Sequence, residues 1–150
     1  MAASDPNLPF LTGDVAPVEA AIRVNLADFE VDEIPAYLPS GEGDHVYLRI
    51  EKSGLATARA VREIARALGA APRDIGFAGH KDAGGVTRQT LSLEHVDEER
   101  VRALDLPRIR VLEVGRHRNK IKLGHLKKAA IPVSRPLIFF QGMATETKVK

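Results

Sequence analysis

The residues best suited to chemistry in this sequence lie in a loop between two short apolar segments. Residues 75–78 are apolar, and they run into His80, Lys81 and Asp82, after which Gly84 and Gly85 lead into the next segment. A carboxylate beside a lysine tends to stay ionised, and an ionised carboxylate can act as a covalent nucleophile. Glycines allow positive φ angles and the close approach of another backbone. The plainer interpretation is a solvent-exposed hairpin loop with a Lys-Asp pair, and the spacing alone favours it.

A second candidate is the basic segment 116–128, which contains six Lys and Arg residues and no acidic residue. Arg116, Arg118, Lys120 and Lys122 alternate along the chain, so they share one face if the segment is a strand. Four cations on one face of an ordered strand favour binding to the phosphates of a nucleic acid. The alternative is an exposed edge strand whose lysines resist aggregation. We favour contact with RNA or DNA.

A third candidate is Glu33, which lies in an acidic stretch that begins after Phe29. Phe29, Val31 and Glu33 alternate, so Glu33 is expected to point inward with the two apolar side chains. A buried carboxylate needs a partner because its burial without one is costly. Glu33 is therefore a candidate site residue, although a solvated acidic strand face is the simpler alternative.

Several other classes of site are excluded or disfavoured by residue usage. The chain has no cysteine, which excludes a disulfide framework, a thiolate zinc site and a cysteine nucleophile. The five histidines have no i, i+4 or HExxH spacing, so we predict no metal site. Only seven aromatic residues are present, which disfavours a large platform for base stacking.

The charge of the chain is distributed unevenly. The net charge is +2, but residues 1–99 carry nine Lys and Arg against 17 Asp and Glu, a charge of −8. Residues 100–150 carry 13 against three, a charge of +10. A basic segment of this kind is typical of a partner that is a polyanion, most often a nucleic acid. A solvated basic tail explains the charge equally well.

The length and composition indicate one domain or a piece of a larger one. The 150 residues are 44% hydrophobic and 28% charged, which is close to the average for a soluble globular protein. No apolar run is long enough to span a membrane, and the first ten residues do not resemble a signal peptide. We therefore expect a cytoplasmic protein with no membrane contact, and we expect residues 1–20 to form an N-terminal leader.

The periodicity predicts an α+β fold, with a largely antiparallel or mixed sheet and helices packed on one face. The clearest element is a helix that starts with Thr57 as its N-cap, buries one apolar face and ends at Gly69. A shorter helix is expected within 97–104. Alternating or apolar segments predict strands at 22–26, 29–33, 45–51, 75–78, 87–93, 110–114 and 120–126.

Four ordered segments together resemble the TruD family of tRNA pseudouridine synthases. The loop resembles the family signature in Phe77-Ala78-Gly79-x-Lys81-Asp82, followed by Val86-Thr87-x-Gln89. The upstream matches are Asp28-Phe29-x-Val31-x-Glu33 and Gly41-Glu42-Gly43-x-His45, which precedes a strand and the helix at Thr57. The downstream match is Arg116-His117-x-x-Lys120-x-Lys122-Leu123-Gly124-x-Leu126-Lys127. The resemblance covers residues 21–127.

This resemblance implies a specific chemistry. The family isomerises uridine to pseudouridine in tRNA, characteristically at position 13, and the matching nucleophile is Asp82. The carboxylate attacks C1′ of the ribose or C6 of the base, and no metal or organic cofactor is implied. Lys81 and Arg88 keep Asp82 ionised or touch phosphate. The other expected active-site residues are Phe29, Glu33, Lys81 and Gln89, and the expected RNA-binding residues are Arg88, Arg116, Arg118, Lys120, Lys122 and Lys127.

The sequence departs from the family pattern after Lys127. The family continues with a Gly-Asn-x-Phe stretch that contributes to the active site, whereas this chain continues with Lys128-Ala129-Ala130. We therefore expect a partial catalytic domain at 21–127 and an unrelated tail at 128–150 that follows a disruption such as a frameshift. Such a chain is expected to be marginally stable, prone to association and weak in catalysis. The alternatives are a non-catalytic RNA-binding fragment and a non-functional translation product.

Overall fold

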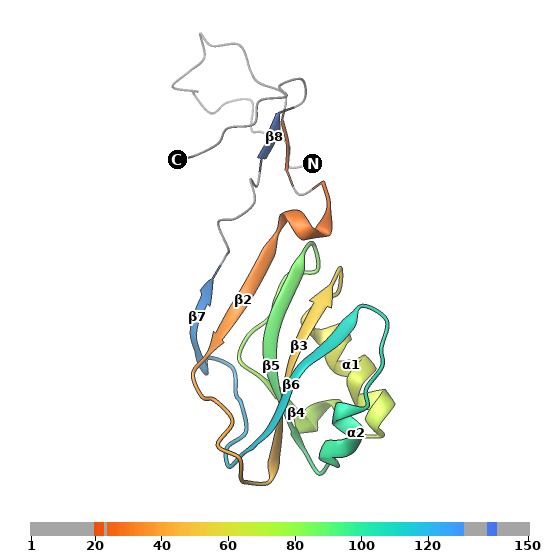
Figure 1. Cartoon of the computed structure of the whole chain (residues 1–150), viewed down its shortest axis with the longest axis vertical. Helices are drawn as coiled ribbons and strands as arrows, with labels where there is room; N and C mark the ends of the chain where they lie inside the picture. The colour runs from red at the N-terminus through yellow and green to blue at the C-terminus, as the bar shows by residue number, and fades with distance from the viewer. Residues whose placement is uncertain (1–19, 23, 131–137, 141–150) are drawn as a thin grey trace.

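The computed structural model describes residues 20–22, 24–130 and 138–140 of the chain (Figure 1). Most of them form one mixed sheet with both α-helices on one face, which confirms the predicted α+β class. The α-helices are α1 (Thr57–Leu68) and α2 (Glu98–Arg102), and two 3-10 turns are η1 (Leu26–Asp28) and η2 (Pro72–Asp74). The strands are β1 (Ala20–Ile22), β2 (Glu30–Pro35), β3 (His45–Ser53), β4 (Ile75–Phe77), β5 (Val86–Glu94), β6 (Ile109–His117), β7 (Leu126–Ala130) and β8 (Ile138–Phe140).

The large sheet has the strand order β6-β3-β5-β2-β7, and β4 pairs with β5 beside β2. All pairs are antiparallel except β2 and β5, which run parallel from Glu30 opposite Val86 to Asp32 opposite Arg88. One edge of β5 is therefore shared, because residues 86–88 pair with β2 and residues 91–93 pair with β4. β1 and β8 form a separate antiparallel pair.

Helix α1 packs on the sheet through the apolar face that the sequence predicts. Val61, Ile64, Ala65 and Leu68 are buried, and they contact the inward side chains of β3 and β5 in one core cluster. Full burial of an Ile or Leu side chain contributes about 1.5–3 kcal/mol each. The helix ends at Gly69, whose left-handed φ of 70° closes the C-terminus as expected. This packing fixes the N-terminus of α1 beside the loop that follows β4.

Three local predictions are wrong. Thr57 is the first helical residue and not the N-cap, which is Ala56. The predicted strand at 22–26 is β1 up to Ile22, and it gives way to the η1 turn. The predicted strand at 120–126 is a loop, because Gly124 adopts a φ of +89° and Ile121 is tied by its backbone N to Ser92 Oγ at 2.9 Å. The remaining strand and helix predictions are confirmed within a few residues.

Two predicted segments lie largely outside the described residues. The N-terminal leader at 1–20 is described only at Ala20, and the tail at 128–150 is described only at 128–130 and 138–140. Neither α-helix in the described ranges has the length and apolar character needed to cross a bilayer.

Candidate active site

Asp82 lies in the loop between β4 and β5, and the residue is exposed to solvent. Its Oδ1 accepts a hydrogen bond from the backbone N of Gly84 at 3.0 Å. A carboxylate that bonds the backbone two residues ahead forms an Asx turn, which fixes its own orientation. The start of the loop is fixed by a 2.9 Å bond from Gly124 N to the carbonyl of Ala78. The loop therefore presents one oriented carboxylate at the surface.

Lys52 anchors this loop from inside the protein, and its side chain is fully buried at the end of β3. Its Nζ donates to the carbonyl oxygen of Asp82 at 3.0 Å and to that of Leu55, and it lies 3.4 Å from that of Lys81. Burial and the nearby charge of Lys81 lower the pKa of Lys52 to about 8, although the Asp82 carboxylate acts in the opposite direction. A buried ammonium is thus placed directly beneath the loop.

Thr57 and Gln89 form a second support for the loop. The backbone N of Lys81 donates to Thr57 Oγ1 at 2.8 Å, and Thr57 Oγ1 in turn donates to Gln89 Oε1 at 2.8 Å. Both side chains are buried, one at the start of α1 and the other on β5. Gln89, which the sequence singled out, therefore reaches the loop through Thr57.

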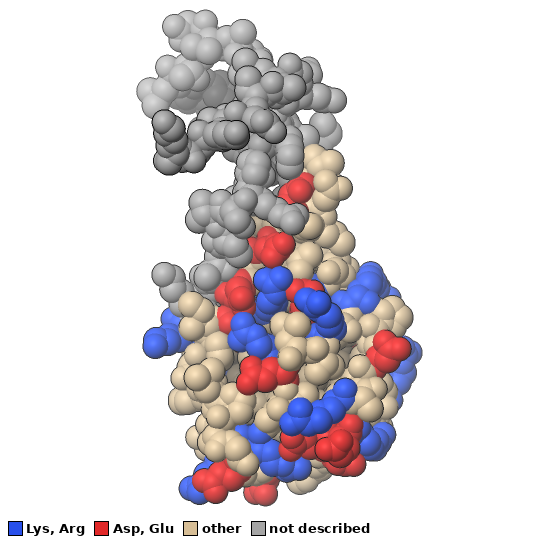
Figure 2. Space-filling view, viewed as in Figure 1, with Lys and Arg blue, Asp and Glu red and all other residues tan. Residues whose placement is uncertain are grey.

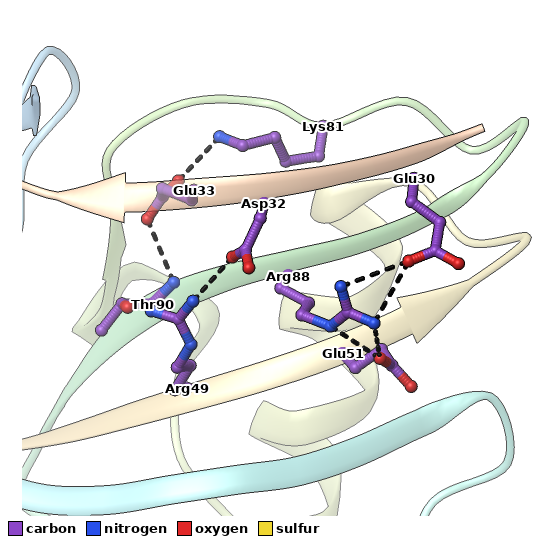
Figure 3. A network of polar contacts seen from close by, with 8 residues as sticks. All are labelled: Glu30, Asp32, Glu33, Arg49, Glu51, Lys81, Arg88 and Thr90. Carbon is purple, nitrogen blue, oxygen red and sulfur yellow. Dashed lines mark hydrogen bonds and ion pairs between the residues drawn. The ribbon is translucent and has the colours of Figure 1, made fainter. Parts of the chain in front are cut away.

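Glu33 points inward from β2, as its alternation with Phe29 and Val31 predicts, and it is 1% exposed. Its Oε2 lies 2.7 Å from Lys81 Nζ, and its Oε1 accepts a hydrogen bond from the backbone N of Thr90 at 3.1 Å (Figure 3). Thr90 falls between the β5 residues that pair with β2 and those that pair with β4. Glu33 thus satisfies a buried N–H at this gap, and Lys81 serves as its counterion.

Phe29 packs against the end of the loop, where a glycine is required. The backbone N of Val86 donates to the carbonyl of Phe29 at 2.9 Å, and a Cβ added to Gly85 would lie 2.3 Å from that same oxygen. By contrast, a Cβ on Gly79 would meet nothing closer than Lys81 Nζ at 3.9 Å. None of the loop glycines has a positive φ. Of the two properties that glycine allows, the loop uses close backbone approach, at Gly85.

A second set of charges lies on the face of the sheet away from the helices (Figures 2 and 3). Arg88 forms ion pairs with Glu51 at 2.8 Å and Glu30 at 3.3 Å, and Arg49 pairs with Asp32 at 2.6 Å. Partial burial opposes the charged form of Arg88, but the hydrogen bond and charge of Glu51, with Glu30 and Asp32, raise its pKa. Arg88 alternates with Gln89, so it leaves β5 on the face opposite the loop supports.

Most of the other predicted RNA-binding side chains are engaged within the protein. Arg116 pairs with Glu98 at 3.0 Å, Lys120 pairs with Glu94 at 3.0 Å, and Arg118 pairs with Glu42 in an exposed contact. Because residues 118–125 form a loop, these cations do not line one face of a strand. Lys122 and Lys127 are exposed, and neither forms an ion pair with a side chain that the structure describes.

Comparison with known proteins identifies the family to which the segment around this loop is similar. The family model of tRNA pseudouridine synthase D (TruD) matches residues 7–130, which include β2, β3, α1 and the whole loop around Asp82. The chain belongs to the TruD family. The four segments singled out in the sequence all lie inside the match, so the expected family is confirmed.

Curated TruD relatives show the same similarity. The chain is 55% identical over 117 residues to tRNA pseudouridine synthase D of Geobacter metallireducens, which covers 78% of this chain and 29% of that protein. It is 51% identical over 121 residues to the protein of the same name from Anaeromyxobacter dehalogenans strain 2CP-C, covering 81% of this chain and 35% of the relative. The chain thus spans about a third of the length of these relatives.

A solved structure shares the fold of the TruD segment described here. A crystal structure of a Methanosarcina mazei protein that carries the name tRNA pseudouridine synthase D superposes with a TM-score of 0.72. The two are 27% identical, and the match covers 79% of this chain and 27% of the other. The mixed sheet and its helices are therefore an arrangement found in this family.

Two residues that support the loop of this TruD member were missed as site residues by sequence reasoning. Lys52 continues the inward row of Val46, Leu48 and Ile50, so strand alternation places it inside the core. That placement alone signals a functional or paired lysine, because an ammonium is rarely buried without partners. The local pattern indicates only a helix start at Thr57, whereas its hydrogen bond to the loop depends on a tertiary contact that no local pattern shows.

Proposed function

We propose that this chain carries the catalytic loop of a tRNA pseudouridine synthase and that Asp82 is its nucleophile. The observation that carries the proposal is the placement of Asp82: an exposed, oriented carboxylate on a loop anchored by buried polar side chains. Preorganised groups of this kind are what a covalent nucleophile requires. Family membership supplies the reaction class, and the names of the relatives supply tRNA as the substrate.

The reaction needs one carboxylate and no net oxidation. The Asp82 carboxylate attacks C1′ of the ribose or C6 of the base of the target uridine, characteristically at position 13. The bond between N1 and C1′ breaks, the uracil rotates, and a bond forms between C5 and C1′. The bond between the carboxylate and C1′ or C6 then breaks and restores free Asp82, while C5 loses a proton and N1 gains one. Because the product is an isomer of the substrate, we propose that neither a metal nor an organic cofactor takes part.

The target nucleotide must leave its stack to reach Asp82, and the phosphates around it need cations. Lys122 and Lys127 are exposed and suited to such contacts. Arg118 pairs with Glu42 at the surface, and an exposed pair of this kind contributes little, so phosphate can replace the carboxylate. Arg88, Arg116 and Lys120 need to exchange partly buried partners first. With tRNA as substrate, we propose that the protein acts in the cytoplasm.

We further propose that residues 21–127 are a partial catalytic domain and that a polypeptide of these 150 residues alone turns over slowly. The relatives devote about two thirds of their length to sequence outside the match. After Lys127 the chain lacks the asparagine and the aromatic of the Gly-Asn-x-Phe stretch that the family resemblance places in the active site. Asp82 would then act with part of its surroundings missing.

The test compares Asp82→Asn with Asp105→Asn, a matched change at an exposed aspartate between α2 and β6. Two quantities are measured for each variant: pseudouridine formed in tRNA and affinity for tRNA. We expect Asp82→Asn to abolish any turnover that the unmodified chain shows and to leave tRNA affinity within about twofold, because the carboxylate reacts with the nucleotide and is not a cation that binds phosphate. Turnover that persists in Asp82→Asn would refute the assignment. Tight tRNA binding without turnover in any form of the chain would favour the alternative, a non-catalytic RNA-binding fragment.

A further inference from the structure

Lys52 is an unusual residue for the interior of this protein. Its side chain is 0% exposed, and it extends the inward row of Val46, Leu48 and Ile50 on β3. An ammonium in such a place must be compensated by hydrogen bonds or by an opposite charge. An apolar residue of similar length would fill the same volume without that cost. The charge is therefore expected to have a role beyond packing.

The partners of Lys52 are main-chain carbonyls. Its Nζ donates to the carbonyl of Leu55, just before α1, and to the carbonyl of Asp82 at 3.0 Å, with Lys81 O at 3.4 Å. Lys52 forms no ion pair with a carboxylate among the described residues. These bonds act on the backbone of the loop and connect it to the start of α1.

We propose that Lys52 is the positioning residue of Asp82: its buried ammonium fixes the main chain that carries the nucleophile relative to β3 and α1. This inference deepens the proposed function and rests on it. Lys52 does not touch the substrate, because it lies beneath the loop whereas Asp82 is on its surface. Its effect passes through the carbonyl of Asp82.

The surroundings of Lys52 fit a dedicated anchor. Thr87 lies opposite Lys52 in the register of β3 and β5, and Gln89 and Thr57 complete a buried polar layer under the loop. Thr87 Oγ1 and Gln89 Nε2 find no hydrogen-bond partner in the described part of the chain. Buried polar groups without partners lower stability. A buried polar layer that lowers stability and lies beneath a single loop is typical of a functional site.

The first experiment detects the hydrogen bond between Lys52 Nζ and the carbonyl of Asp82 in the 150-residue chain. The carbonyl carbon of Asp82, labelled with ¹³C and assigned by NMR, is followed as pH rises. Burial lowers the pKa of Lys52 to about 8, and the charges that act on it are Lys81, itself paired with Glu33, and Asp82. The carbonyl resonance should therefore shift with an inflection near pH 8. Lys52→Met should remove that inflection.

The second experiment removes and restores the ammonium. In Lys52→Met, amide exchange at Lys81 and Gly84 should accelerate at least tenfold more than exchange within α1. The chain has no cysteine, so Lys52→Cys can be alkylated in denaturant to S-aminoethylcysteine and refolded. This restored ammonium should slow exchange in the loop again. Val101→Ala, a buried core change on α2, controls for loss of global stability.

The outcomes separate the inference from the proposed function. An Asp82 carbonyl resonance that stays flat from below pH 8 to pH 10.5, the ordinary pKa of lysine, would overturn the positioning role, even if Lys52→Met failed to fold. Loop exchange in folded Lys52→Met equal to that in Val101→Ala would overturn it as well. Neither measurement depends on turnover. Turnover that survives Asp82→Asn would refute the proposed nucleophile and leave the measured anchor in place.

Discussion

At the scale of single residues, the site is organised by buried charges that lie beneath one exposed carboxylate. Glu33 and Lys81 form an ion pair with side chains only 1% and 7% exposed, and Glu33 also satisfies the N–H of Thr90. The sequence predicted the inward direction of Glu33 from its alternation. It could not identify Lys81 as the partner, because that contact joins residues 48 positions apart.

Glu33→Gln should leave the Lys81 ammonium buried without a counterion. Removal of one partner of a buried pair costs about 3–5 kcal/mol, so the free energy of unfolding should fall by roughly that amount. Urea denaturation measures the change, with Glu63→Gln as the control because it affects only a pair with the exposed Arg59. The double variant Glu33→Gln with Lys81→Met should recover part of the loss. A Glu33→Gln chain as stable as Glu63→Gln would contradict this description of the pair.

The lowered pKa of Lys52 has a consequence for stability. The unfolded chain binds the Lys52 proton up to its ordinary pKa of 10.5, whereas the folded chain releases it near pH 8. Between these values the unfolded state holds more protons, so stability should rise with pH by about 3 kcal/mol at most. We expect this rise in the unfolding free energy of the unmodified chain relative to Lys52→Met. A difference between the two proteins that stays constant with pH would contradict the burial of a charged Lys52.

At the scale of elements, strong hydrophobic periodicity was sufficient to predict helices and strands, whereas alternation of charge alone predicted a strand that does not form. The face of α1 and the alternation of β3 and β5 predicted their elements because each one buries an apolar surface against the same core. The alternating cations at 116–122 have the spacing of a strand, but the segment lacks an apolar surface of this kind. Arg116 and His117 end β6, and the residues that follow form a loop that is fixed by the hydrogen bond from Ile121 N to Ser92 Oγ and by the positive φ of Gly124. Charge alternation does not encode these tertiary and backbone features.

The variant Gly85→Ala tests how closely the loop packs against the start of β2. In Gly85→Ala the new Cβ would lie 2.3 Å from the carbonyl oxygen of Phe29, so the backbone must shift. Overpacking of this kind costs about 1–3 kcal/mol, which thermal or urea unfolding can measure. Gly79→Ala is the matched control in the same loop, because its Cβ meets only Lys81 Nζ at 3.9 Å. Equal stability of the two variants would show that Phe29 does not pack on Gly85 in this way.

The loop between β6 and β7 and the start of β7 are where tRNA contact can be tested, because Lys122 lies in the loop and Lys127 lies on the strand. If Lys122 and Lys127 bind phosphates, replacement of both by Gln should reduce the slope of log affinity against log salt by about two. Arg62→Gln, an exposed cation on α1, should leave the slope unchanged. The measurement is tRNA affinity at several salt concentrations. An unchanged slope in the double lysine variant would assign phosphate binding to other residues.

At the scale of the whole molecule, the chain presents one part of a TruD protein. Within the described residues, β6 and β7 each have a free strand edge, and large apolar side chains such as Leu38 and Leu123 are exposed. Such surfaces favour association. The sequence was sufficient to predict the family and the fold class, because ordered motifs and periodicity are local features. The side chains that support the loop around Asp82 could be identified only from the three-dimensional contacts.

The most direct test places this segment in a complete relative. In a chimera, residues 21–127 replace the matching segment of tRNA pseudouridine synthase D from Geobacter metallireducens, so that the relative's own sequence follows Lys127, and tritium released from C5 of uridine in tRNA measures turnover. We predict that the chimera is active, that its turnover is at least about 100-fold faster than that of the 150-residue chain, and that Asp82→Asn abolishes this activity. Asp105→Asn should retain it. Turnover that is unaffected by Asp82→Asn would contradict the assignment of the nucleophile.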